Sequence, residues 1–341
     1  MRIYWIDFLR VVSAIAVIAI HSVTNFYATL APSTGEWWLS NFLMTTAKSS
    51  GPAIFVMIAG FILLNKKVDY AEFYKSRSRR ILVPLVFWSI LYSVFTLVFI
   101  DNSFRDFIWR LTIGFILSGT TYFHLWYLSM FVWLMLFTPA LSKILQGDPL
   151  NSNDVKIFII ISIAFFSLSS LSNVKEAVTG SEITWFNNFG IYIFYFILGH
   201  LIPKHINSVK ISEKMLLLIY ISILAVSMLM NYVMANKGLR DDNMIIGDDT
   251  IFGFFAAIFF FTFITKVGPG KGISNELYTA AESSFGVYLI HPLILFFVSN
   301  ITVLLAFGAV STIFLNISAT TALSFCAVHY LRKTGPGTRI T

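Results

Sequence analysis

The first apolar segment of the chain, IDFLRVVSAIAVIAIHSV (residues 6–23), contains three ionisable side chains, Asp7, Arg10 and His21. Arg10 and His21 are eleven residues apart, which on an α-helix is three turns plus about 20°, so they project from nearly the same face, about 16 Å apart. Asp7 precedes Arg10 by three residues, the spacing of an ion pair. An arginine alone could snorkel from a helix end. A deep histidine on the same face indicates an internal cavity that serves transport, proton relay or catalysis.

The chemistry of these side chains suggests a role for each. A neutral imidazole can take a proton from a hydroxyl near neutral pH, so His21 is the candidate general base. An arginine held by Asp7 can bind a phosphate or stabilise negative charge on an oxygen. Cys326 is the only cysteine, so neither a disulfide nor a thiolate cluster can form within one chain, and no spacing of His or carboxylate residues predicts a metal site.

The composition indicates a membrane protein. Hydrophobic residues make up 57% of the 341 residues and charged residues 12%, whereas soluble domains carry roughly 25% charged residues. Apolar runs of about 20 residues recur, each long enough to cross a hydrocarbon core roughly 30 Å thick. We predict an all-α polytopic helical bundle with about ten transmembrane helices, at residues 6–28, 39–64, 81–100, 124–144, 156–172, 187–203, 214–234, 250–266, 284–303 and 308–331. Charges interrupt residues 102–123, which we expect to form an amphipathic or re-entrant piece.

The distribution of charge predicts the orientation of these helices. With the N-terminus inside, most lysines and arginines that flank the spans fall on the cytoplasmic side, as the positive-inside rule requires. The predicted outer side holds only Arg105, Arg110, Lys175, Lys237 and Arg240. We therefore predict cytoplasmic termini, a membrane domain over residues 1–331 and a short basic cytoplasmic tail over 332–341. The net charge of +7 is explained by this bias and does not indicate nucleic-acid binding.

The Arg-x10-His spacing on the first span resembles the signature of the acyltransferase family 3 membrane proteins. Further segments are similar to this family in the same order along the chain: SGPAIFVMIAGFILL (50–64), FYKSRSRRILVP (73–84), HLWYL (124–128), TP (138–139) and SSFGVYLIHPLI (283–294). Ala59 stands where serine is more usual in the family. The likeness covers nearly the whole chain and is greatest for the short branch that has only the membrane domain.

The resemblance implies an O-acyltransferase of the bacterial inner membrane. Members of this branch transfer an acyl group, usually acetyl, from cytoplasmic acetyl-CoA to a hydroxyl of a cell-surface polysaccharide or its lipid-linked precursor. The donor is a substrate, and no permanently bound cofactor or metal is expected. His21 would be the general base, with a covalent acyl-histidine as an open alternative. Arg10 and Asp7 would complete the catalytic set.

The resemblance also implies a donor site in the basic loop, where Arg77 and Arg80 fit the Arg-x-x-Arg pattern of the family. Together with Arg79 they could fork onto the phosphate oxygens of acyl-CoA. The positive-inside bias alone would also explain a basic loop here. If the third helix begins early, Arg77 and Arg80 share one face.

Other polar and aromatic residues are candidates for the cavity or the acceptor side. His124 could line the acceptor entrance or be a plain interfacial histidine. Pro292 frees a carbonyl in the turn before it, so His291 could serve either catalysis or a structural hydrogen bond. The full set is His124, Trp126, Lys48, His291 and Tyr288.

A second hypothesis is a transporter, which could use the same buried polar residues to bind a small polar or acylated substrate. Transporters are often built from two matching halves, and no repeat pairs residues 1–170 with residues 171–341. A structural scaffold would leave Arg10 and His21 unexplained.

Overall fold

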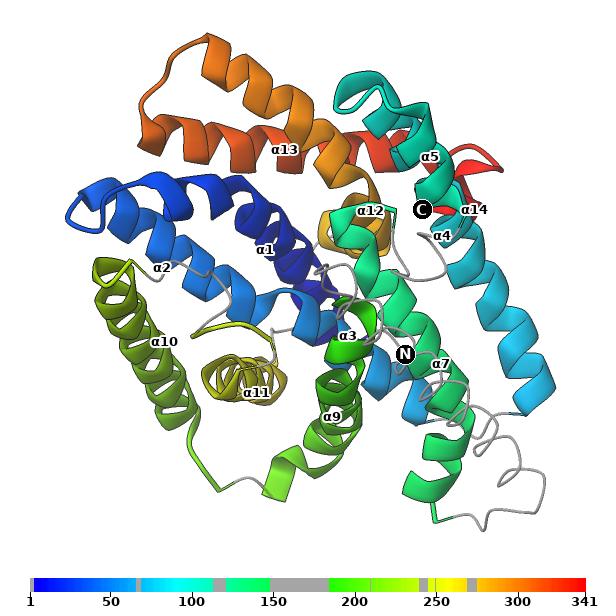
Figure 1. The fold of residues 1–341 in the computed structure, drawn as a ribbon. Coiled ribbons are helices and arrows are strands. Elements are labelled where there is room, and N and C mark those ends of the chain that lie inside the picture. Colours follow the sequence, from blue (N-terminus) through cyan, green and yellow to red (C-terminus); the bar gives the residue numbers. More distant parts are fainter. Residues whose placement is uncertain are drawn as a thin grey trace. The chain divides into compact units, whose positions relative to one another are not determined.

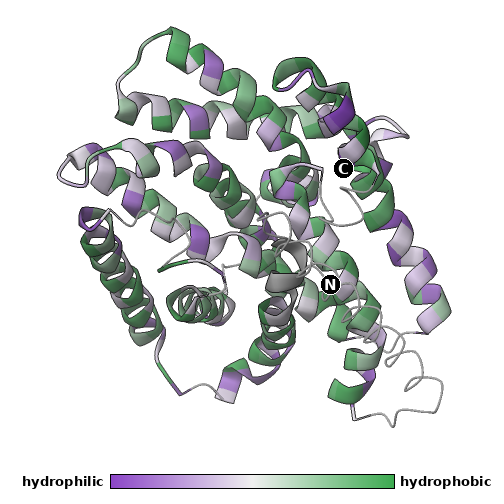
Figure 2. Cartoon of the chain, in the orientation of Figure 1, coloured by the Kyte–Doolittle hydropathy of each residue, from purple (hydrophilic) through white to green (hydrophobic). Residues whose placement is uncertain are grey.

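All regular elements are helical in the part of the chain that the computed structural model describes (Figure 1). These residues are 3–65, 69–112, 121–147, 184–208, 210–238, 245–248, 250–268 and 275–341. Among the described residues, seven helical stretches are long and apolar enough to cross a membrane, one of them being Gly35–Leu64. Figure 2 shows the hydrophobic residues that dominate them. The all-helical membrane fold is therefore confirmed.

Several predicted spans match observed helices closely, whereas others begin earlier or are interrupted. The helix α11 (Ile251–Val267) is a shorter apolar helix, and α9 (Thr184–His205) covers the predicted span 187–203. The predicted span 156–172 lies outside the described residues.

The helices form two compact units. The first unit contains residues 1–61, 195–334 and Thr341, and the second contains residues 62–194 and 335–340. In the first unit, α1 (Tyr4–Thr29) contacts α2 (Gly35–Ser50), α12 (Asn275–Leu304) and α13 (Ala309–Leu331). The helix α10 (Glu213–Asn236) packs against α11, and both contact α2.

Small residues let α1 approach its neighbours closely. Ala16 and Ala19 pack against Ala47 of α2, and Ala14 packs in a buried cluster with residues of α12 and α13. Such small residues are typical of helix contacts in membranes, where tight packing replaces the hydrophobic effect as the driving force. The helix has no interior glycine or proline, so it runs unbroken past both Arg10 and His21.

The second predicted span, 39–64, is interrupted. α2 ends at Ser50, Gly51 has a non-helical ψ of −115°, and α3 (Pro52–Leu64) follows. The break arises because Pro52 has no N–H and its ring disfavours a helical conformation in the residue before it. A Cβ at Gly51 would lie 3.4 Å from Cδ1 of Ile20, so the break lies against α1 beside His21.

In the second unit, α4 (Tyr70–Phe99) contacts α5 (Phe104–Leu111), α7 (Trp126–Leu145) and α14 (Gly337–Ile340). α4 begins eleven residues before the predicted span 81–100, because the Asp69 side chain caps it by accepting the backbone N–H of Glu72 at 3.0 Å. The helix α5 exposes Phe104, Ile108 and Trp109. It lies in the segment predicted to be amphipathic, of which residues 113–120 lie outside the described part.

Candidate functional site

The helices α1 and α12 bring His21 and His291 together. Their ring centroids are 5.4 Å apart and the rings are stacked, with an angle of 21° between their planes. His291 is fully buried, and His21 is partly buried. The first span and the ninth predicted span therefore share a histidine pair.

The ring of His291 is oriented by a hydrogen bond within its own helix. Its Nδ1 lies 2.7 Å from the carbonyl oxygen of Tyr288. In a regular helix this carbonyl would accept the N–H of residue 292, but that residue is Pro292 and has no N–H. His291 takes the hydrogen bond that the proline leaves open. The Tyr288 ring is buried, and its centroid lies 6.0 Å from that of His291.

Two carboxylates contribute to the electrostatic environment of Arg10. Asp7 on its own helix and Glu282 on α12 both interact electrostatically with its guanidinium, as does Tyr278 of α12. Asp7 is buried, with 6% of its surface exposed. Asp7 and a second acidic residue, from the neighbouring helix α12, thus both act electrostatically on Arg10.

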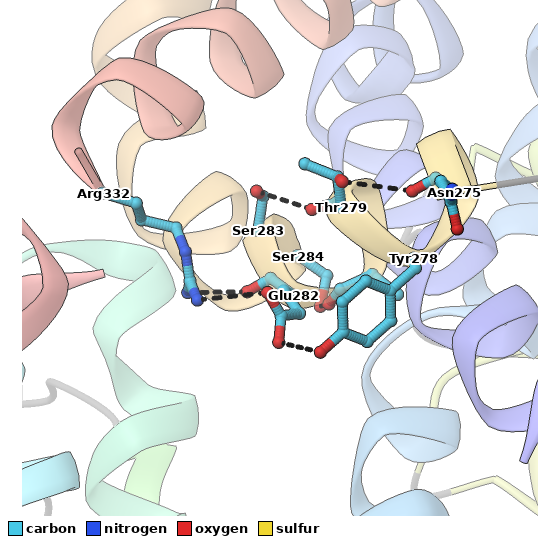
Figure 3. A network of polar contacts seen from close by, with 8 residues as sticks. Asn275, Tyr278, Thr279, Glu282, Ser283, Ser284 and Arg332 are labelled. Atoms are coloured by element: carbon cyan, nitrogen blue, oxygen red, sulfur yellow. Dashed lines mark hydrogen bonds and ion pairs between the residues drawn. The ribbon is translucent and has the colours of Figure 1, made fainter. Parts of the chain in front are cut away.

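Glu282 is the centre of a polar network (Figure 3). The Tyr278 hydroxyl donates a hydrogen bond of 2.5 Å to its Oε1, and Arg332 Nη2 lies 3.7 Å from its Oε2. Arg332 Nη1 also donates to the Glu282 backbone carbonyl at 2.8 Å. Sequence reasoning missed Tyr278, Glu282 and Arg332. Spacing gave no signal for them, since the nine residues from Glu282 to His291 make two and a half turns of an ideal helix and place these two side chains on opposite faces.

Arg10 and His21 thus face the same neighbour, α12, as their spacing predicts. An apolar layer lies between Arg10 and His21 along α1. In it, Ala14 and Ile18 pack against Val287 of α12 and Val328 of α13. A flexible substrate arm that reached from Arg10 to His21 would have to pass beside this layer.

Lys48 is buried in the last turn of α2, with 6% of its surface exposed. Its neighbour Ala47 packs on α1, and the Oγ of Ser49 lies 2.9 Å from the Tyr220 hydroxyl. The helix break at Gly51 follows within one turn. Lys48 therefore belongs to the same unit and the same stretch of α2 that contacts α1 near His21.

His124 is buried among aromatic rings in the second unit. Only 1% of its surface is exposed, and its ring centroid lies 4.8 Å from that of Tyr92 and 5.7 Å from that of Tyr122. His124 is thus not a water-exposed interfacial residue. Trp126 follows in α7, with its ring 5.6 Å from that of Tyr192.

The three arginines of the basic segment lie in the first turns of α4. Arg77 is partly buried and its guanidinium carbon lies 5.8 Å from the centroid of the Phe73 ring, whereas Arg79 and Arg80 are exposed. Since α4 begins at Tyr70, Arg77 and Arg80 lie three helical residues apart on one face. These arginines belong to the second unit and the histidine pair to the first.

A helical membrane protein with a histidine pair, of which His291 is fully buried and His21 partly buried, falls in the class whose intramembrane ionisable groups serve a chemical or transport function. Residues 3–329 match the family of acyltransferase 3 domains, so the chain belongs to this family. Comparison with curated proteins and with solved structures gave no significant match. The protein is therefore a membrane acyltransferase, and the resemblance seen in its sequence is confirmed.

Proposed function

We propose that this acyltransferase moves an acetyl group from cytoplasmic acetyl-CoA to a hydroxyl of a cell-surface polysaccharide or its lipid-linked precursor. The proposal places it in the bacterial inner membrane with about ten spans and both termini in the cytoplasm, as the charge distribution favours. The N-terminal end of α1, with Arg10, then faces the donor. His21 lies deeper, toward the side from which the acceptor arrives.

The observation that carries this proposal is the histidine pair at one level of α1 and the arginine–carboxylate network at another. Acyl transfer from a thioester needs a base for the attacking hydroxyl and cations for the phosphates of the donor. A histidine in the core of a membrane protein is costly to bury. The separation of the two groups along one helix suits a donor whose charged and reacting ends are far apart.

In the proposed step, His21 takes the proton from the acceptor hydroxyl while the hydroxyl oxygen forms a bond to the thioester carbonyl carbon. The carbon–sulfur bond breaks, and the thiolate leaves with the electron pair. The proton held by His21 then passes to sulfur, giving free coenzyme A and the ester. Arg10 would bind the donor, and the fork-shaped guanidinium groups of Arg77, Arg79 and Arg80 suit phosphate oxygens of acyl-CoA.

The test uses the full chain purified in detergent and given acetyl-CoA with and without a saccharide acceptor. Free thiol and acylated product are measured separately. We expect His21→Ala to lose transfer by at least about a hundredfold, within the range for loss of a general base, while it still binds coenzyme A. Arg10→Ala should instead weaken donor binding.

A matched control is His200→Gln, because His200 is a buried histidine of α9 in the same unit. This variant should transfer at the wild-type rate. Equal activity of His21→Ala and His200→Gln would refute the role of His21.

The second candidate function is transport, which the break between α2 and α3 favours, since discontinuous helices form the binding sites of many transporters. Uptake of a saccharide into liposomes without any acyl-CoA would support transport. Thioester cleavage that depends on His21 would support the enzyme.

A further inference from the structure

We propose that His291 is a second catalytic residue, whose Nε2 accepts a hydrogen bond from a hydroxyl of the acceptor next to the one that is acylated. This inference rests on the proposed function, in which His21 takes the proton from the reacting hydroxyl. It gives the two histidines different tasks: His21 removes the proton, and His291 orients the acceptor. It also narrows the acceptor to molecules that carry neighbouring hydroxyls.

The first step of the argument is the tautomer of His291. Its Nδ1 lies 2.7 Å from the carbonyl oxygen of Tyr288, and a carbonyl oxygen only accepts hydrogen bonds, so Nδ1 must carry the hydrogen. In a neutral imidazole the other nitrogen, Nε2, then holds a lone pair. His291 is thus prepared to accept a hydrogen bond through Nε2.

The second step is that Pro292 keeps this tautomer in place. The Tyr288 carbonyl is the one that residue 292 would use in a regular helix, and proline cannot donate to it. The His291 ring therefore meets no competing backbone donor from residue 292. The sequence His-Pro has a direct consequence for the ring chemistry of His291, beyond any bend in the helix.

The third step is the charge on the pair. The rings of His21 and His291 are stacked at 5.4 Å, and two positive charges at this distance repel each other strongly in a site that is largely buried. Once His21 has taken the proton, His291 stays neutral and keeps its lone pair on Nε2. His291 can therefore hold the acceptor throughout the transfer.

The fourth step is the shape of the acceptor. One hydroxyl has a single hydrogen, so the hydroxyl that His21 deprotonates cannot also donate to His291. Two adjacent imidazoles can instead hold two adjacent hydroxyls of one molecule. Many pyranose rings of saccharides carry two neighbouring free hydroxyls, whereas a simple alcohol does not.

The tautomer of His291 can be determined without an activity assay. In the full chain labelled with ¹⁵N-histidine, with His291→Phe used for assignment, we expect the His291 signals of a ring protonated at Nδ1 and unprotonated at Nε2. In Pro292→Ala, the new backbone N–H should compete for the Tyr288 carbonyl and populate the other tautomer. A wild-type ring protonated at Nε2 would overturn the proposal, as would no change of tautomer in Pro292→Ala.

The role of His291 in the reaction is tested with two cyclic acceptors, cis-1,2-cyclohexanediol and cyclohexanol, and with acetyl-CoA as donor. Loss of one hydrogen bond corresponds to about a tenfold change, so wild type should acylate the diol about ten times faster. His291→Phe keeps a stacked ring without nitrogen and should lose this preference. Pro292→Ala should lose part of the preference, and Pro203→Ala, a proline in α9, should keep it.

Two outcomes would overturn the proposal: equal use of both acceptors by wild type, or an unchanged preference in His291→Phe. If wild type acylates neither, the proposed acceptor chemistry and this inference fail together. The nuclear magnetic resonance experiment still reports the tautomer of His291 in that case. A wrong tautomer is therefore distinguished from a wrong acceptor.

Discussion

Gly60 and Gly199 allow α3 and α9 to touch through their backbones, and replacing either glycine should separate the two helices. A Cβ at Gly199 would lie 2.0 Å from the carbonyl oxygen of Met57, and a Cβ at Gly60 would lie 1.8 Å from that of Phe196. Ordinary contacts begin at 3.4 Å, so the helices would have to move apart by more than an ångström. These atoms are backbone, so a rotamer change cannot relieve the clash.

We expect Gly199→Ala to destabilise the protein by about 1–3 kcal/mol, the usual range for overpacking, or by more if the helices cannot shift. The matched control is Gly190→Ala in the same helix, because nothing lies within 4 Å of the Cβ added there. Alanine should be neutral or stabilise that position by up to about 1 kcal/mol, since it has the higher helix propensity.

The assay follows the folded fraction of each variant in detergent after heating, by size-exclusion chromatography with fluorescence detection. Gly60→Ala and Gly199→Ala should both lose the folded peak at a lower temperature than wild type. The double variant should be less destabilised than the two effects together, because one separation of the helices relieves both clashes. If Gly199→Ala is as heat-resistant as Gly190→Ala, the close approach of α3 and α9 is wrong.

Three further predictions concern polar side chains. Arg77→Gln should raise the KM for acetyl-CoA roughly tenfold through loss of a charge-assisted contact, whereas Lys75→Gln, exposed on the same helix, should leave the KM unchanged in a steady-state assay. Asn231→Ala should lower stability by about 1 kcal/mol, because Asn231 donates a buried 2.9 Å hydrogen bond to Asn41; Ser227→Ala, one turn earlier, is the control in the same heating assay. Glu282→Gln should weaken acetyl-CoA binding in calorimetry by loosening Arg10, and unchanged affinity would show that Asp7 alone positions the arginine.

The shared face of Arg10 and His21 could be predicted from sequence, because helical periodicity fixes it once the segment is known to be a helix. The long spans could be predicted for a similar reason, since only length and hydropathy are needed to cross a bilayer. The early start of α4 was also readable in principle, from Asp69 and Glu72, which are typical of a capped helix start. The predicted span began at residue 81 instead, because the continuous apolar run begins there.

The partners across helices could not be predicted in the same way. Nothing in the local sequence indicates that His291 stacks on His21, or that Glu282 acts electrostatically on Arg10, because both depend on how α12 packs against α1. Pro292 did predict a freed carbonyl, but the residue that would satisfy it depends on a side-chain rotamer. Gly51 and Pro52 signalled the interruption of the second span, yet the strong hydropathy around them favoured a continuous helix.

Because α1 is unbroken from Tyr4 to Thr29, the distance between Arg10 and His21 along the helix axis is fixed at about 16 Å. Under the proposed function, this fixed distance selects the length of the molecule that carries the acyl group. A thioester on a truncated carrier such as N-acetylcysteamine could not bind Arg10 while it reacts at His21. The reach of the carrier, as well as the identity of the acyl group, would then decide which donors this protein accepts.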